Sequence, residues 1–140
     1  MKRKGVIVTA AGLIALAVVA AGQETPEKKK GAAEVSFTSD VLPIIKQHCL
    51  PCHAQDNDNP SELALDDFDL MKAGGRHGDL FVSGKSKESL LIQKFGEDPP
   101  FGGRMPLNPK KKIQEGKAKW LSDDEVKIIA LWIDQGAKKN

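Results

Sequence analysis

Apolar residues recur at helical spacing just before the only two cysteines of the chain. Val41, Ile45 and Cys49 fall at positions i, i+4 and i+8, which lie on one face of a helix. Because Pro43 is tolerated only in the first turn, this helix should begin near Asp40 or Val41. Three residues that commonly cap helices stand at its start: Thr38, Ser39 and Asp40.

The clearest helix pattern lies near the end of the chain. Ser122 and Glu125 form an S-x-x-E capping box, which marks the start of a helix. The residues that follow repeat at i, i+3, i+4 and i+7 and predict one apolar face: Val126, Ile129, Ala130 and Ile133. Gly136 should end this helix.

Shorter elements are predicted between these two helices. Residues 67–72 should form a short helix ended by Gly74-Gly75. Residues 86–95 predict another helix, capped by Ser86 and ended by Gly96. The prolines and glycines of residues 98–106 predict an irregular loop.

The first 22 residues are typical of a secretory signal peptide. Lys2-Arg3-Lys4 precedes an uncharged, mostly apolar run from Val6 to Ala21, and small residues follow at the end of that run. The run is short for a membrane span, so cleavage is favoured over an uncleaved anchor. Residues 23–36 are charged and lack apolar periodicity, which predicts a disordered tether. Residues 37–140 then form the single folded domain.

The charge balance argues against one class of partner. The chain has 21 basic and 19 acidic side chains, but the leader carries three of the basic ones and no acid. The remainder is therefore close to neutral, which argues against nucleic acid. Its charges are segregated into an acidic stretch over residues 56–69 and a basic stretch over residues 110–119. These stretches are either solvated loops or a means of steering a charged redox partner.

The two cysteines belong to one motif, Cys49-Leu50-Pro51-Cys52-His53. The spacing C-x-x-C-H is that of covalent haem attachment, in which each thiol bonds one vinyl group and the histidine binds iron. A zinc site formed with His77 would need four protein ligands, yet only one C-x-x-C pair is present. A thioredoxin-like dithiol would need a βαβ context, and a disulfide across so short a loop would stabilise little.

With these residues the chain resembles a single-haem c-type cytochrome domain of the planctomycete type. The matching segments lie before, within and after the cysteine motif: Leu42-Pro43-Ile44-Ile45, Cys49 to His53, Gly74-Gly75, Gly84, Ser89-Leu90-Leu91, Met105-Pro106, Leu131-Trp132-Ile133 and Gly136-Ala137. The resemblance implies an all-α, small cytochrome c fold whose helices cross around one covalently bound haem c. It also implies thioethers at Cys49 and Cys52, with His53 as proximal and Met105 as distal iron ligand. Residues 110–119 resemble an insertion.

Other residues compete with Met105 for the distal position. Met71 lies in a short helical pattern with Phe68 and Leu70 and is interpreted as a core residue. His77 is the main rival. His48 lies at the same helix end as the attachment site, so it is a poor candidate for the distal ligand.

These features predict an electron carrier and not an enzyme. We expect one haem c, a monomeric protein in the periplasm or secreted, and redox proteins as partners, a membrane-bound oxidoreductase among the candidates. Two other functions remain open. The protein could be a haem enzyme or sensor with a labile distal ligand, or the haem module of a larger oxidoreductase complex.

Overall fold

The described part of the chain is helical. A computed structural model describes residues 33–57, 59 and 61–140; the predicted signal peptide and most of the predicted tether lie outside this range. The helical segments are η1 (Phe37–Val41), α1 (Leu42–His48), α2 (Phe68–Ala73), η2 (Ser86–Glu88), α3 (Leu90–Gln93), α4 (Lys110–Gln114) and α5 (Asp123–Asp134). The described residues form no strand, which agrees with the predicted all-α class. No helix among them is both long and apolar enough to cross a membrane.

The first helix begins earlier than predicted. Ser36 caps η1 by accepting a hydrogen bond from the Ser39 backbone N–H, and the Ser36 N–H donates in return to the Asp40 carboxylate at 2.8 Å. These reciprocal bonds supply the cap that we expected from Thr38, Ser39 or Asp40. Pro43 lies in the first turn of α1, as predicted, and α1 ends at His48, directly before the cysteine motif.

The predicted helix over residues 86–95 is wrong in part, because it is broken at Ser89. Ser89 is fully buried in an extended conformation between η2 and α3. Its hydroxyl accepts from the Val82 N–H at 2.9 Å and donates to the Lys85 carbonyl at 2.8 Å. Ser86 also differs from the prediction, since it bonds the Asp134 carboxylate and does not cap the helix. Side-chain bonds to the backbone thus replace a regular helical turn.

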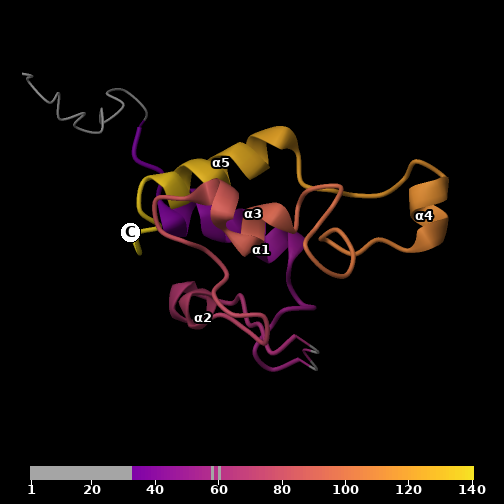
Figure 1. The fold of residues 1–140 in the computed structure, drawn as a ribbon, viewed down its shortest axis with the longest axis horizontal. Helices are drawn as coiled ribbons and strands as arrows, with labels where there is room; N and C mark the ends of the chain where they lie inside the picture. The colour runs from indigo at the N-terminus through magenta and orange to yellow at the C-terminus, as the bar shows by residue number, and fades with distance from the viewer. Residues whose placement is uncertain (1–32, 58, 60) are drawn as a thin grey trace, which may run out of the picture. The chain divides into compact units, whose positions relative to one another are not determined.

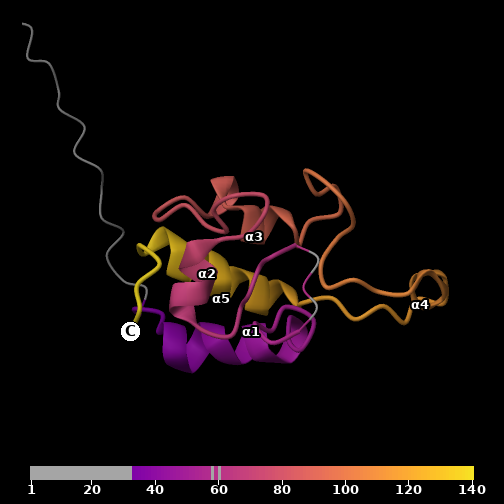
Figure 2. The same ribbon diagram turned by 90° about the horizontal axis from the view of Figure 1, so that it is seen from below.

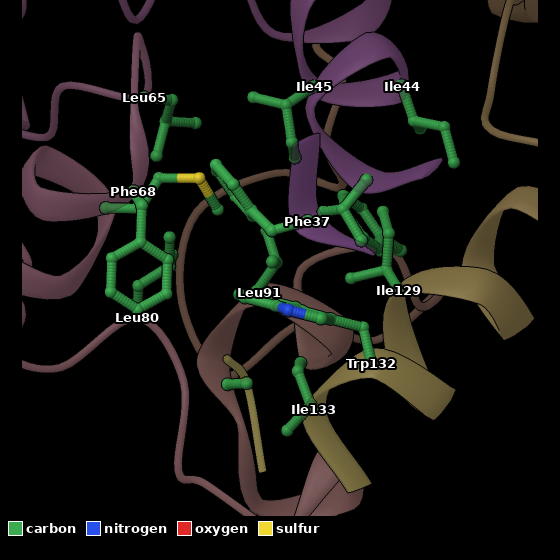
Figure 3. Close-up of a cluster of buried hydrophobic side chains, with 14 of the residues drawn as sticks. Phe37, Ile44, Ile45, Leu65, Phe68, Leu80, Leu91, Ile129, Trp132 and Ile133 are labelled. Atoms are coloured by element: carbon green, nitrogen blue, oxygen red, sulfur yellow. The ribbon is translucent and has the colours of Figure 1, made fainter. Parts of the chain in front are cut away.

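The core lies between the N-terminal and C-terminal helices. Trp132 of α5 is 1 % exposed, and its ring centroid lies 5.5 Å from that of Phe37. Figure 3 shows these two rings between Ile45 of α1 and Ile133 of α5. Phe81 and Phe68 pack edge-on against the Trp132 ring at 5.1 and 6.3 Å. The short α2, predicted from residues 67–72, therefore contributes to the same core through Phe68.

Hydrogen bonds join the C-terminal residues to the start of the domain. The Val35 N–H donates to the Gln135 side chain at 2.8 Å, and the Phe37 N–H donates to the Asn140 side chain at 2.8 Å. Residues 33–36, the end of the predicted tether, are therefore packed against the domain.

A capped helix start joins α5 to the end of α1. Ser122 and Glu125 form both bonds of the predicted capping box. The second oxygen of Glu125 lies 2.9 Å from Nε2 of His48, the last residue of α1. Figure 2 shows the ribbons of α1 and α5 next to each other. The bond fixes the helix end from which the cysteine motif leaves.

The Glu125 contacts predict an acid-sensitive part of the stability. The Ser122 backbone N–H and His48 hold the pKa of Glu125 below its usual 4.5. A lowered folded-state pKa stabilises the fold above pH 4.5, and this contribution is lost as the pH falls through the folded value. Glu125→Gln keeps the capping geometry without the charge, so it should cost up to about 1 kcal/mol at neutral pH. Denaturant unfolding of both proteins should show this difference shrinking in acid; a constant difference would contradict it.

Candidate haem site

Residues from distant parts of the sequence line one cavity of about 340 Å³. Its volume falls within the range of roughly 300–1,000 Å³ that is usual for cofactor and small-molecule pockets. The walls are mainly apolar side chains: Leu63, Leu65, Leu80, Leu91 and Phe95. The predicted site residues Cys49, Cys52, His53 and Met105 all line this cavity. The structure therefore brings together the two ends of a site that are separated by about half of the domain in sequence.

The two cysteines are free thiols at the end of α1. Cys49 is half-buried and continues the helix through a bond from its N–H to the Ile45 carbonyl at 2.8 Å; Cys52 is exposed. Burial, with a smaller effect of Cys52, raises the pKa of the Cys49 thiol to about 12. The thiolate is the nucleophile in dithiol chemistry, so this raised pKa makes Cys49 a poor attacking thiol. The described residues also contain no cluster of three or more His, Cys, Asp or Glu side chains suited to a metal ion.

The His53 ring is held in one orientation. Its Nδ1 lies 3.1 Å from the Leu63 backbone oxygen. A carbonyl can only accept, so Nδ1 must carry the proton, and Nε2 is left with the lone pair that could bind a metal. The backbone N–H of His53 donates to Cys49, and its carbonyl accepts from Leu65 at 2.8 Å. The histidine is thus fixed by both its ring and its backbone.

Leu63 is a positioning residue that the sequence did not reveal. The Asn59 side chain also donates to its carbonyl, and Gly75 packs directly behind it. A Cβ atom at Gly75 would lie only 2.9 Å from the Leu63 Cβ and from the Ser61 oxygen. The Gly74-Gly75 pair therefore ends α2 and also permits this close approach. No local pattern marks a backbone carbonyl as an imidazole acceptor.

Met105 and Met71 have different environments. Met105 is half-buried in the predicted loop and lines the cavity, and its N–H donates to the Lys94 carbonyl at 2.8 Å. Met71 is fully buried in the core, as its interpretation as a core residue requires. Only Met105 of these two lines the cavity.

The other histidines also reach the cavity wall. His48 is engaged by Glu125, as described above. His77 is exposed, and its ring stacks on the Phe101 ring with 4.0 Å between centroids. His77 therefore lines the same cavity as Met105 and stays a candidate for the distal position.

A buried lysine in the cavity wall was missed by the sequence analysis. Lys94 is 9 % exposed, and its Nζ donates to the carbonyls of Phe101 and Gly103 at 2.6 and 2.8 Å. Burial lowers the pKa of this lysine. Its position between the apolar residues Leu91 and Phe95 was the available signal, since a lysine there must either reach solvent or find acceptors.

The residue types and their surroundings fit a haem. Two thiols can form thioethers, an imidazole nitrogen and a thioether sulfur are common axial ligands, and most of the remaining wall is apolar. Residues 49–106 match the family model described as Planctomycete cytochrome C. No curated protein and no solved structure matches the chain. The matched segment begins at Cys49 and ends one residue after Met105, so it spans the cavity-lining residues that were predicted to hold the haem.

Proposed function

The chain carries a planctomycete-type cytochrome c domain, and from this premise we propose that it is a single-haem electron carrier working outside the cytoplasm. A cytochrome c domain indicates haem-based electron transfer, and an electron carrier more than an enzyme. The finer assignments are our proposal: one haem c, ligation by His53 and Met105, and a periplasmic or secreted location that follows from the predicted leader.

One observation supports the proposal above all others. Cys49, Cys52, His53 and Met105 line the same apolar cavity, and the hydrogen bond to Leu63 leaves Nε2 of His53 able to bind iron. Bound haem would supply an iron that takes up and releases one electron. The chain's own task is then to hold the two axial ligands, to exclude water with its leucine-rich wall, and to present the site to a partner. Helices crossing around the haem would follow from the position of the cavity beside α1 and α3.

A visible spectrum with a redox titration tests this function. The purified protein should show haem absorption, reduce reversibly with one electron, and resist cyanide and carbon monoxide at neutral pH. Rapid binding of either ligand would instead favour the haem enzyme or sensor. Co-purification with an oxidoreductase would favour a haem module of a larger complex. A protein without haem absorption after expression with haem-maturation machinery would overturn the proposal.

We also propose that the basic stretch recruits an anionic redox partner. α4 stands apart from the other helices in Figures 1 and 2 and carries Lys110, Lys111 and Lys112. Exposed Ile113 lies on the same helix, and Leu107, 69 % exposed, lines the cavity shortly before α4 begins in the sequence. Apolar residues surrounded by lysines suit a transient contact with an acidic protein surface, in which charge mainly raises the association rate.

Charge reversal on α4 should slow electron transfer with an anionic reagent. In Lys111→Glu/Lys112→Glu, the rate constant for oxidation of the reduced protein by hexacyanoferrate(III) should fall by about tenfold at low salt, because steering by surface charge is lost. High salt should remove most of the difference. Lys72→Glu/Lys87→Glu is the matched control, since it changes two exposed lysines elsewhere. Equal slowing in the control would show that only net charge matters.

Size-exclusion chromatography would test the expected monomer.

A further inference from the structure

Among the described residues, the segment that carries Met105 is hydrogen-bonded to the rest of the protein through a single residue, while Phe101 and Arg104 of the segment also stack on the His77 and Trp120 rings. Residues 97–105 form neither helix nor strand. Within the described part of the chain, every hydrogen bond that joins these residues to the rest of the protein goes to Lys94. The Met105 N–H donates to the Lys94 carbonyl, and the Lys94 ammonium donates to the carbonyls of Phe101 and Gly103.

Lys94 is itself held firmly. It caps the C-terminal end of α3, where its N–H donates to the Leu90 carbonyl at 2.9 Å. The neighbouring Leu91 and Phe95 are buried in the core. The Lys94 Nζ also lies 4.5 Å from the centroid of the Phe101 ring, so its three donors face two carbonyls and an aromatic face. Lys94 therefore binds residues 101–105 through both its backbone carbonyl and its side-chain ammonium.

We propose that Lys94 is a positioning residue that clamps residues 101–105 over the cavity and so holds Met105 at the distal side of the site. This inference rests on the proposed function, because it assumes that Met105 is the distal ligand. A lysine suits this role better than an apolar residue, since the carbonyls of Phe101 and Gly103 receive charge-assisted hydrogen bonds that a hydrocarbon cannot provide. The clamp keeps the segment closed, and exogenous ligands reach the site only when it opens.

Lys94→Met tests the clamp because methionine keeps an unbranched side chain and removes the donors. In the haem-containing protein, the variant should bind imidazole at least about tenfold more tightly, since the apparent affinity rises with the fraction of open molecules. Lys94→Arg retains donors and should restore much of the resistance to imidazole. Lys87→Met, at an exposed lysine, should behave as the unmodified protein. Imidazole affinity in Lys94→Met equal to that of the control would overturn the clamp.

Amide hydrogen exchange supplies a readout independent of ligand binding. In the unmodified protein, the Met105 amide should exchange more slowly than those of Gly102 and Gly103, and this protection should be lost in Lys94→Met. Equal exchange of these amides in the unmodified protein would contradict the clamp, even if the variant failed to fold.

The two proposals fail differently. If Lys94→Met speeds exchange but Met105→Ala leaves the haem spectrum unchanged, Lys94 holds residues 101–105, but Met105 is not a ligand that it positions. If Met105→Ala opens the site and Lys94→Met alters neither exchange nor imidazole binding, the ligand stands and the clamp is wrong.

Discussion

Replacing Cys49 and Cys52 together with alanine should abolish covalent haem attachment. The chain has no other cysteine, so no other thiol can form a thioether. Both side chains line the cavity beside His53, whose Nε2 is left able to bind iron by the bond to Leu63. Intact-mass measurement of the parent protein should show the addition of one haem, and the double variant should show none. Haem that remains with the parent after denaturation and solvent extraction should be lost from the variant.

The single variants make this test stricter. Cys49→Ala and Cys52→Ala should each retain at most one thioether, and the half-buried Cys49 should be the more disruptive site because it is continuous with α1. Met71→Leu alters a buried core residue outside the cavity and should keep the haem. Covalently bound haem in the double variant would refute attachment at these residues. A mass increase of two haems in the parent would refute the single-haem assignment.

The parts of the fold that could be predicted are those set by local chemistry. The capping box at Ser122 and Glu125 needs only residues three apart, and the apolar face of α5 needs only one helical repeat. The short helix before Gly74 is likewise marked by its own cap and stop. In the same way, five consecutive residues of the C-x-x-C-H motif are enough to indicate covalent haem attachment.

The parts that failed depend on contacts that reach further along the chain than one helical repeat. The break at Ser89 is stabilised by a bond to Val82, and Ser86 is drawn to Asp134, so helix periodicity could not reveal either. The Leu63 carbonyl that orients His53 and the Lys94 contacts to Phe101 and Gly103 involve the backbone as acceptor. A backbone carbonyl is present at every position, so the sequence cannot show which one will be used.

Met105→Ala should open the proposed site to exogenous ligands and lower its reduction potential. A thioether ligand favours ferrous iron, and axial ligands set haem potentials over about 0.8 V, so a decrease on the order of 0.1 V is expected. Cyanide should bind the variant rapidly, and the weak long-wavelength band that the family resemblance implies for Met-ligated ferric haem should disappear. Potentiometric titration followed by visible absorption measures the potential and the band, and mixing a separate portion of the oxidised protein with cyanide measures the binding rate.

Two variants separate the distal ligand from its rivals. Met71→Leu should keep the band and the potential, because Met71 is fully buried in the core and does not line the cavity. His77→Ala should also keep them if Met105 binds iron, although it removes the ring that stacks on Phe101. Loss of the band in His77→Ala with its survival in Met105→Ala would assign the distal position to His77. A band that survives both substitutions would require a ligand other than these two residues. Because Met105 and His77 line the same cavity, this comparison, and not their positions in the sequence, decides between them.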